Sequence, residues 1–337
     1  MRLMNNSLVL LLCLAALVNL NAQKSYNLVF YNVENLFDTE DDPITLDEDF
    51  TPEGKQQWTT ERYQVKLRMI SQVLDSLHKP HLIGLAEVEN EKVLEDLINT
   101  DALKTEGYGI IHKNSPDMRG IDVALLYKKQ DFKVLETAFI RVNFPDFIEK
   151  DYTSRDILYA KGKLSNGEIL HIFVNHWPSR RGGLSQSEPK RLFVAQHVKK
   201  AVDDILYKDP KAMVVLMGDF NDEPDNSSIA SVLGALPDTS AALDGLLYNC
   251  FYSQDKAKKG SYNFRGNWNM LDQFIVSGYL KDPKAPLMVK KPTIHKYKWL
   301  LYEGKNGATP NRTYGGPNYY GGFSDHLPVS IELKGRQ

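Results

Sequence analysis

Short apolar segments that run into a carboxylate, amide or imidazole side chain recur along the whole chain. Five of them carry the most chemistry, and they lie at residues 29–34, 84–87, 173–176, 216–221 and 271–274. Apolar runs of this length, rich in β-branched and aromatic residues, favour buried β-strands. Active sites of layered α/β proteins gather where such strands end. The pattern therefore predicts buried sheets with one functional edge.

Further apolar runs predict the rest of the sheets, and two helices are expected beside them. The additional strand-like runs are 123–127, 157–159 and 329–333. Several runs are apolar on both faces, which suits sheets covered by other layers. A helix is predicted by spacings of three and four from Tyr63 to Leu77, with Thr59 or Thr60 as its cap. A second helix is expected from Pro189, a good first-turn residue, to about Lys208.

The N-terminal residues 1–22 have the order of a secretory signal peptide. Arg2 precedes an apolar run and then a short polar segment that ends at Ala22. The alternatives are a membrane anchor, for which the run is short, and a lipoprotein at Cys13, after which more apolar residues follow. We therefore expect a secreted or periplasmic protein without an integral membrane span. Removal of this segment leaves Cys250 as the remaining cysteine, so stability must come from a core rather than a disulfide.

Residues 23–337 are expected to form a single domain. They contain no fixed-period repeat, low-complexity tract or flexible linker, and 42% of the sequence is hydrophobic. The formal net charge of −2 disfavours a protein that simply coats nucleic acid. Charge is uneven, however, because residues 34–53 are acidic and residues 281–312 are mainly basic. These segments are either solvated loops or an acidic rim and a basic, substrate-facing segment.

Two short motifs indicate metal-assisted hydrolysis of a phosphate ester. Ser324-Asp325-His326-Leu327 places a carboxylate beside an imidazole, and Gly218-Asp219-Phe220-Asn221 places two polar side chains two residues apart. Residues i and i+2 of a strand share a face, so Asp219 and Asn221 could converge on one phosphorus. An acid, an amide and an imidazole can together activate water and contact phosphate.

With these motifs in this order, the chain resembles the endonuclease/exonuclease/phosphatase superfamily, which includes deoxyribonucleases, abasic-site endonucleases, inositol-polyphosphate 5-phosphatases and neutral sphingomyelinases. The resemblance extends from Tyr31-Asn32-Val33-Glu34-Asn35 to Ser324-Asp325-His326. It implies an α/β fold, a four-layer α/β sandwich of two mixed β-sheets packed face to face with helices outside. The strand and helix pattern fits this fold.

The resemblance also implies a divalent metal site. Glu87 would be the direct carboxylate ligand, with Asn32 and Asp325 near the metal, and Glu34 occupies the position where relatives often carry a second acid near the metal. Mg²⁺ is the expected cofactor, with Mn²⁺ or Ca²⁺ as alternatives, because a hard cation needs few protein oxygens and keeps water for catalysis. The acidic stretch from Asp38 to Asp49 lacks the spacing of a known calcium loop and is interpreted as solvated.

Catalytic roles follow from the same resemblance. Asp219 would polarise the attacking water, Asn221 would hold the phosphate or nucleophile, His326 would face a phosphate oxygen, and Asp272 would orient His326. His176 matches a second active-site histidine of the deoxyribonuclease and sphingomyelinase branches. Whether Asp219 or His326 accepts the proton stays open. Substrate-binding candidates are Arg155 (or Tyr152 in its place), Arg180 and Arg181; Arg119 and Asp122 have no assigned role.

Three functions remain compatible with the sequence. A basic, aromatic C-terminal segment suits the backbone and bases of nucleic acid, which favours a monomeric, secreted nuclease. The rival enzyme function is that of a phospholipid or sphingomyelin phosphodiesterase, or a phosphomonoesterase, with the same aromatics touching a lipid surface instead. From another class, the chain could be a non-catalytic binding protein on the same scaffold.

Overall fold

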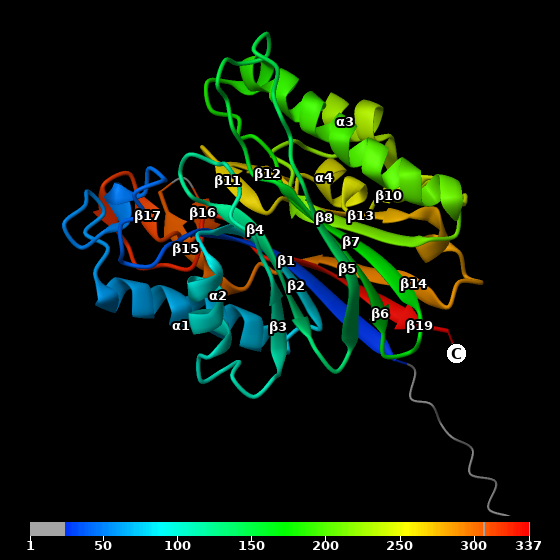
Figure 1. The fold of residues 1–337 in the computed structure, drawn as a ribbon, viewed down its shortest axis with the longest axis horizontal. Helices are drawn as coiled ribbons and strands as arrows, with labels where there is room; N and C mark the ends of the chain where they lie inside the picture. The colour runs from blue at the N-terminus through cyan, green and yellow to red at the C-terminus, as the bar shows by residue number, and fades with distance from the viewer. Residues whose placement is uncertain (1–23, 306, 337) are drawn as a thin grey trace, which may run out of the picture.

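The computed structural model describes residues 24–305 and 307–336; the expected signal peptide lies outside them. Two large mixed sheets make up most of the fold (Figure 1). The six-stranded sheet has the order β14 (Leu287–Ile294), β19 (Val329–Gly335), β1 (Ser25–Leu36), β2 (Leu82–Val88), β4 (Asp122–Lys128) and β3 (Tyr108–Ile111). The seven-stranded sheet has the order β5 (Phe132–Ile140), β6 (Ile157–Leu164), β7 (Ile169–His176), β8 (Met213–Asp219), β13 (Asp272–Ser277), β10 (Leu247–Asn249) and β9 (Ala235–Pro237).

The two sheets pack face to face through alternate residues of their strands. In β1, Leu28 and Phe30 belong to the core between the sheets, whereas Val29 and Tyr31 pack on the outer side. A strand directs successive side chains to opposite faces, so a strand that is apolar throughout must be covered twice. The predicted four-layer α/β sandwich is therefore confirmed.

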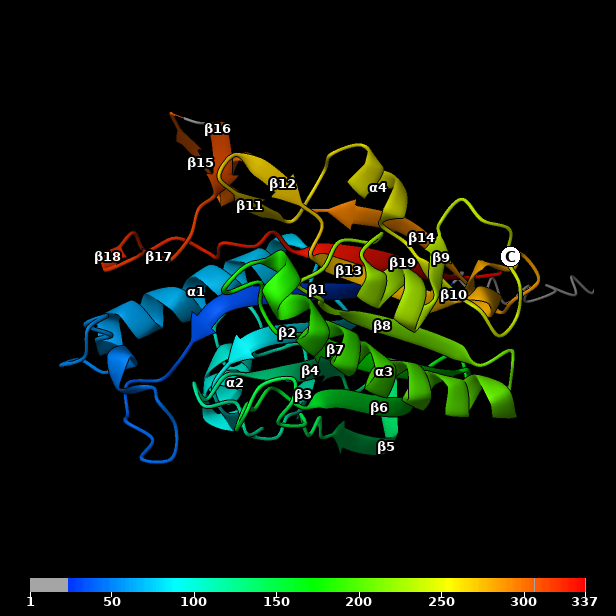
Figure 2. The same ribbon diagram turned by 90° about the horizontal axis from the view of Figure 1, so that it is seen from above.

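Helices supply the two outer layers. The helices α1 (Thr60–Ser76) and α2 (Glu91–Ile98) cover the six-stranded sheet, and α3 (Leu184–Lys208) covers the seven-stranded sheet (Figures 1 and 2). Thr59 caps α1, as expected, by accepting a hydrogen bond from the Arg62 amide.

The second helix was predicted to begin at Pro189, but α3 begins five residues earlier, after Gly183. Pro189 lies inside the helix, where its missing N–H leaves the Ser185 carbonyl without the usual helical partner. Side-chain hydrogen bonds stabilise this turn, because Arg191 donates to the Leu184 carbonyl (3.2 Å) and to the Ser187 hydroxyl (2.8 Å).

The basic segment 281–312, for which a solvated loop was one expectation, lies in a part of the chain that contains regular structure. Strand β14 lies at the edge of the six-stranded sheet, and the hairpins β15–β16 (Leu301–Gly304, Gly307–Pro310) and β17–β18 (Tyr314–Gly315, Asn318–Tyr319) follow it. A further hairpin, β11–β12 (Tyr262–Phe264, Asn267–Asn269), and the short helix α4 (Tyr252–Lys256) precede β13. Among the helices of residues 24–305 and 307–336, none is long and apolar enough to cross a membrane.

The topology brings the functional strand ends together. Strands β1 and β2 run parallel in one sheet, and β7 and β8 run parallel in the other. β13 pairs antiparallel with β8 so that Asp272 lies opposite Asp219. The polar residues at these positions therefore meet at one edge of the sandwich, between the two sheets.

Candidate active site

The backbone at the strand ends is held in an unusual conformation. Glu34 (φ 53°), Glu87 (φ 64°) and Asn221 (φ 51°) all have positive φ, which side chains with a Cβ rarely adopt. The pairing of β2 shifts register between Ala86 and Val88 with β4, so Glu87 occupies a bulge. Strained residues of this kind persist only where the surroundings fix them, and they cluster at functional sites. Here the distortion turns polar side chains out of the strand ladder.

Asn32 links the two sheets at the bottom of the site. Its amide donates to Asp219 Oδ2 (3.1 Å) and to Glu87 Oε1 (3.4 Å), and its oxygen accepts from the Glu34 amide (3.0 Å). Glu87 also accepts from the Asn35 amide at 3.1 Å. With both ends of its side chain engaged, the buried Asn32 positions the carboxylates.

His326 is held by Asp272. Nδ1 of the imidazole lies 2.7 Å from Asp272 Oδ2, and Ser261 donates to the same oxygen at 2.5 Å. The His326 ring also packs on Tyr262, with 4.8 Å between ring centroids. These contacts leave Nε2 of His326 facing the cavity, 3.8 Å from Asp219 Oδ2.

The two histidines of the site have opposite electrostatic properties. Burial disfavours the His326 imidazolium, but the Asp272 and Asp219 carboxylates outweigh burial and hold the pKa of His326 well above its usual value. Burial together with the cationic Arg155 and Arg119 holds the pKa of His176 well below its usual value. His326 is therefore cationic and His176 neutral. His176 lies 3.8 Å from Glu87 and 3.7 Å from Asp219, measured from its Nε2.

The pKa of the Asp219 carboxyl lies close to neutral pH. Burial raises its pKa to about 7, although His326 and hydrogen bonds from Asn221 and Asn32 act in the opposite direction. The Asn221 amide N–H donates to Asp219 Oδ1 (2.9 Å), and the Asn221 side chain donates to the Trp177 carbonyl (2.9 Å). A carboxyl with a pKa near the working pH is suited to act as a general base.

These groups open onto one cavity of about 650 Å³. Glu87, His176, Asp219, Asn221, Asp325 and His326 all line it. Asp272 and Asn32 lie behind this lining, where they are almost completely buried. The cavity also has an aromatic wall, formed by Tyr262, Phe264, Asn269 and Leu271, and it is lined by Arg119 and residues 179–184.

Glu34 accepts hydrogen bonds from the C-terminal part of the chain. Its carboxylate accepts from the Thr313 amide (2.6 Å) and from Arg312 Nε (3.3 Å), while Arg312 also donates to Asp325 (3.0 Å). Glu34 thus fixes the segment that carries Asp325 and does not itself line the cavity.

The three predicted substrate-binding arginines differ in how far their donors are already engaged by the described residues. Arg155 is 4% exposed and donates to the carbonyls of His176 (3.2 Å) and Trp177 (2.6 Å) and to Asp117 (3.0 Å). Arg180 donates to the Asn221 carbonyl (2.7 Å) and to Asn226 (3.0 Å). These two arginines therefore shape the loops that carry His176 and Asn221. Arg181 is exposed and has no hydrogen bond or ion pair within residues 24–305 and 307–336.

The donor set fits a hard divalent cation. Carboxylates of Glu87, Asp219 and Asp325 line the cavity, and burial, with Glu87 adding to it, raises the pKa of Asp325. A cation there would relieve this repulsion. A tighter group is formed by Asp219, Asp272 and His326, whose atoms lie within 4.8 Å of one another. His326 and Asp272 already share a hydrogen bond, so Glu87 and Asp325 are the residues that could hold a cation.

Lys66 is a site residue that the sequence did not reveal. It is buried in α1 and its Nζ donates to Thr313 Oγ1 (2.5 Å) and to the Phe323 carbonyl (2.8 Å). Burial lowers its pKa to about 8, although Glu34, Asp325 and Glu87 counteract this effect. One sequence feature could have indicated its burial. Lys66 lies three residues after Tyr63 and four before Ile70, so it falls on the apolar face of the helix.

Arg119 and Asp122, which had no assigned role, have different environments in the structure. Asp122 is buried and accepts from the Ser115 amide at 3.0 Å, with His112 Nε2 3.4 Å away. It closes the loop between β3 and β4. Arg119 lies on that loop and lines the cavity. Arg312 and Tyr262 also contact the site, but nothing near them in the sequence indicated this.

The chain belongs to the Endonuclease/Exonuclease/phosphatase family, whose sequence profile matches residues 27–335. Members of this family are metal-dependent phosphodiesterases and phosphatases. No curated protein matches the sequence significantly.

Solved structures with the same fold share few residues with this chain. A truncated TDP2 of Caenorhabditis elegans is 16% identical with a TM-score of 0.56, and the alignment covers 92% of this chain and 97% of that one. A mannosyl-6-phosphatase of Bacteroides thetaiotaomicron is 19% identical with a TM-score of 0.55, covering 91% and 99%. A D. rerio TDP2 complexed with a single-strand DNA product is 15% identical with a TM-score of 0.54, covering 92% and 99%.

Proposed function

We propose that this protein is an exported, metal-dependent phosphodiesterase that cleaves nucleic acid. The observation that carries the proposal is the convergence of Glu87, Asp219 and a cationic His326 on one cavity with an aromatic wall. Support for the substrate comes from this wall and from the DNA product bound by a structural relative. Export rests on the segment 1–22, and N-terminal sequencing of the mature protein tests it.

The proposed reaction is an in-line attack of water on phosphorus. Asp219 accepts the proton of the water, since its pKa of about 7 leaves it partly ionised at neutral pH. The His326 imidazolium donates a hydrogen bond from Nε2 to a phosphoryl oxygen, while Asp272 fixes its tautomer and charge. A divalent cation held by Glu87 and Asp325 would supply Lewis-acid polarisation of a phosphoryl oxygen. His176 is neutral and would contribute a hydrogen bond rather than a charge.

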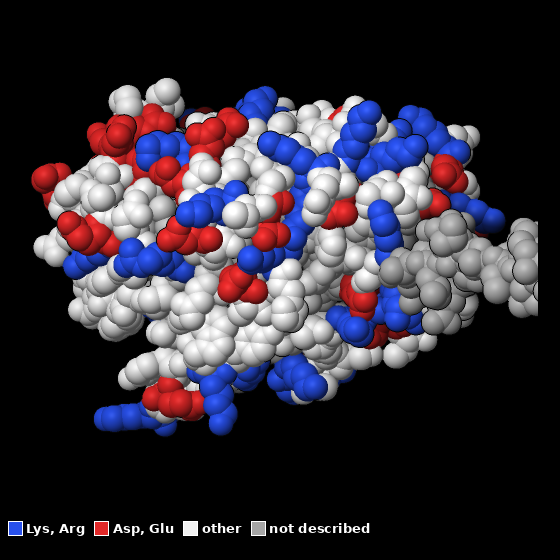
Figure 3. Space-filling model, turned by 90° about the horizontal axis from the view of Figure 1, so that it is seen from below, with Lys and Arg blue, Asp and Glu red and all other residues white. Residues whose placement is uncertain are grey.

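The aromatic wall supports single-stranded nucleic acid as substrate. Phe264 lines the cavity and is 52% exposed, and the Arg265 guanidinium lies 5.1 Å from the centre of its ring. An exposed aromatic ring beside a cation can stack a base and hold the backbone. Acidic and basic side chains are interspersed over the face in Figure 3, so this face is not uniformly basic.

The test is a substrate panel with matched variants. Protein spanning residues 23–337 is given Mg²⁺, Mn²⁺ or Ca²⁺ with single-stranded DNA, RNA, a simple phosphodiester, a phosphomonoester and choline phospholipids. We expect cleavage of the nucleic acids, and Phe264→Ala should raise their KM about tenfold by removing one stacked base. Tyr207→Ala is the control, because Tyr207 is 91% exposed on α3 and does not line the cavity.

Three outcomes would contradict the proposal. Release of phosphocholine without cleavage of nucleic acid would identify a lipid phosphodiesterase. Hydrolysis of the phosphomonoester alone would identify a phosphatase. Binding of metal with no turnover on any substrate would favour a non-catalytic binding protein.

A further inference from the structure

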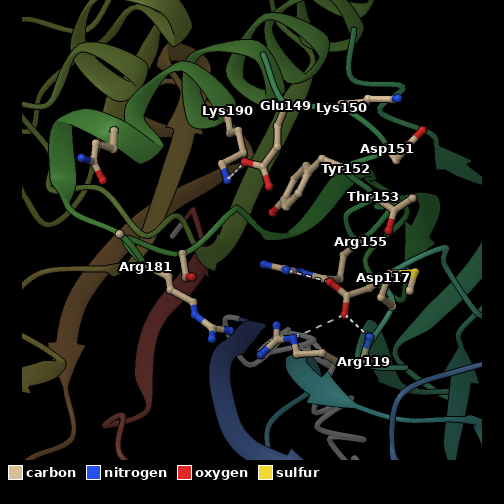
Figure 4. A pocket seen from close by; sticks show the side chains of 14 residues that line it. Asp117, Arg119, Glu149, Lys150, Asp151, Tyr152, Thr153, Arg155, Arg181 and Lys190 are labelled. Atoms are coloured by element: carbon tan, nitrogen blue, oxygen red, sulfur yellow. Dashed lines mark hydrogen bonds and ion pairs between the residues drawn. The ribbon is translucent and has the colours of Figure 1, made fainter. Parts of the chain in front are cut away.

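A second cavity of about 610 Å³ adjoins the catalytic one. It is built from the β3–β4 loop around Asp117, the loop 149–155 and the first turns of α3 (Figure 4). Four residues line both cavities: Arg119, Ser179, Arg181 and Gly182. A ligand held at the catalytic groups can therefore extend past these residues into the second cavity.

Positive charge at the junction between the cavities is only partly neutralised. Asp117 is shared by Arg155 Nη1 (3.0 Å) and Arg119 Nε (3.5 Å), so one carboxylate serves two guanidiniums. Arg181 has no ion-pair partner in the described part of the chain, and Figure 4 shows its guanidinium turned toward that of Arg119. Together they form a pair of donors suited to a phosphate group.

Neutral donors and a further ion pair lie deeper in the same cavity. The Tyr152 hydroxyl points into it, and the ring is held by Phe144 (4.9 Å between centroids) and by the Lys190 ammonium (4.3 Å from the ring centre). Lys190 is paired with Glu149. Thr153 also lines the cavity, but its hydroxyl, which has no hydrogen-bond partner in the described residues, is buried.

We propose that this second cavity is a subsite for a second phosphate group of the substrate bound at Glu87 and His326. The inference rests on the proposed function. In a nucleic-acid strand the second group is the phosphate next to the scissile one, on the side away from Phe264. A base would then stack on the aromatic wall while the adjoining phosphate is held between Arg119 and Arg181. The same chemistry would accept the second phosphate of a small bisphosphate ester.

The test compares substrates that differ by one phosphate. The thymidine dinucleotide with a single internal phosphate is compared with the same dinucleotide carrying a 5′ or a 3′ terminal phosphate. A hexose bisphosphate is compared with the hexose monophosphate in parallel. Kinetics with Mg²⁺ are measured for each, and equilibrium binding is measured by calorimetry in the inactive Asp219→Asn background so that the substrate is not consumed. We expect one terminal phosphate to lower KM and Kd about tenfold, the effect of one good charge-assisted contact.

Two variants with opposite expected effects address the subsite directly. Lys190→Gln removes a cation that lines only the second cavity and should reduce the gain from the terminal phosphate to less than about threefold. Glu149→Gln removes the competing carboxylate and should increase the gain. Lys200→Gln is the matched control, since Lys200 is exposed on α3 and pairs with Asp204. Opposite shifts from neighbouring residues would not arise from a general loss of folding.

The outcomes separate this inference from the proposed function. If neither dinucleotide phosphate nor the second hexose phosphate changes Kd, or if Lys190→Gln behaves like Lys200→Gln, the subsite is wrong. If only the hexose bisphosphate gains, and no dinucleotide is cleaved, the subsite stands and the nucleic-acid substrate falls. Cleavage of all dinucleotides at equal KM and Kd would leave the nuclease in place and remove the subsite.

Discussion

His326 Nδ1 lies 2.7 Å from Asp272 Oδ2, and Asp272 in turn lies opposite Asp219 in the pairing of β13 with β8. The strand register therefore places the group that charges the imidazole beside the candidate base. The antiparallel pairing of β13 with β8 therefore sets the distance between the proposed base, Asp219, and the residue that positions the proposed cation, Asp272. The hydroxyl of Ser261, donating to the same Asp272 oxygen, fixes the carboxylate from the other side.

Replacing Asp272 by Asn should lower both activity and the pKa of His326. The amide has the same shape but no negative charge, so the largest of the influences that raise the pKa of His326 against burial is removed. We expect kcat to fall by ~10²–10⁴. If His326 acts as the imidazolium, the alkaline limb of the kcat profile should move to lower pH. The measurement is kcat against pH, with Asp204→Asn on α3 as the control; an alkaline limb that stays at the wild-type pH would show that His326 does not act as the cation.

Asp219 should make the metal-free protein less stable as the pH rises. Burial raises the pKa of this carboxyl from 3.8 to about 7 in the folded protein. Between these values the folded state binds more protons at Asp219 than the unfolded state, so the free energy of unfolding falls with rising pH through this window. Above about pH 7 the loss is complete.

The variant Asp219→Asn lacks this titration. We expect its metal-free Tm to exceed that of the wild type at pH 8 by a few degrees and the difference to shrink toward pH 4, while turnover is lost. Thermal unfolding of both proteins in EDTA across this range is the measurement. A difference in Tm that is constant with pH would rule out the ionisation of Asp219 as its cause.

Much of the site could be anticipated because its residues follow apolar runs. Asn32, Glu87, Asp219 and His326 each sit where a strand pattern ends or begins, and local sequence carries that signal. The structure brings them to one cavity, as the shared edge of the sheets requires. The contacts of Arg155 and Arg180 could not be predicted from the sequence. Both side chains donate hydrogen bonds to backbone carbonyls that lie close only in the folded structure.

The fold could be predicted for the same reason. The elements that the sequence did not predict correctly were missed for physical reasons. The core strands are apolar on both faces and stand out in the sequence. Strand β14 is half polar, contains Pro292 and lies at a sheet edge, so its pattern resembles a loop. The early start of α3 was missed because Pro189 is a strong helix-start signal, whereas the actual start at Gly183 has no side-chain cap.

Removal of divalent metal should abolish turnover, and Glu87 should be the residue that most affects metal binding. Its carboxylate is held toward the cavity by the Asn35 amide and the Asn32 side chain. We expect EDTA to stop hydrolysis, added Mg²⁺ or Mn²⁺ to restore it, and saturating metal to raise Tm through binding to the folded state. Glu87→Gln should reduce this rise in Tm, while Glu95→Gln, on the exposed side of α2, should retain it. An unchanged rise in Glu87→Gln would place the metal elsewhere.

Lys66 should stabilise the protein and position the metal-binding segment at the same time. Its ammonium bridges α1 to Thr313 and to the Phe323 carbonyl, two residues before Asp325. Lys66→Met keeps the length of the side chain but leaves Glu34 and these acceptors without their cation, so we expect a loss of about 2–4 kcal/mol in the free energy of unfolding.

The activity of the same variant distinguishes positioning from stability alone. If Lys66 sets the place of Asp325, the metal concentration needed for half-maximal activity should rise severalfold in Lys66→Met at a temperature where it is fully folded. Denaturant unfolding and a metal titration of activity are the two measurements. Arg68→Met, at an exposed position of the same helix, should change neither. An unaltered metal requirement in a destabilised Lys66→Met would confine Lys66 to a structural role, because the packing of residues 313–323 would then be independent of the metal ligands.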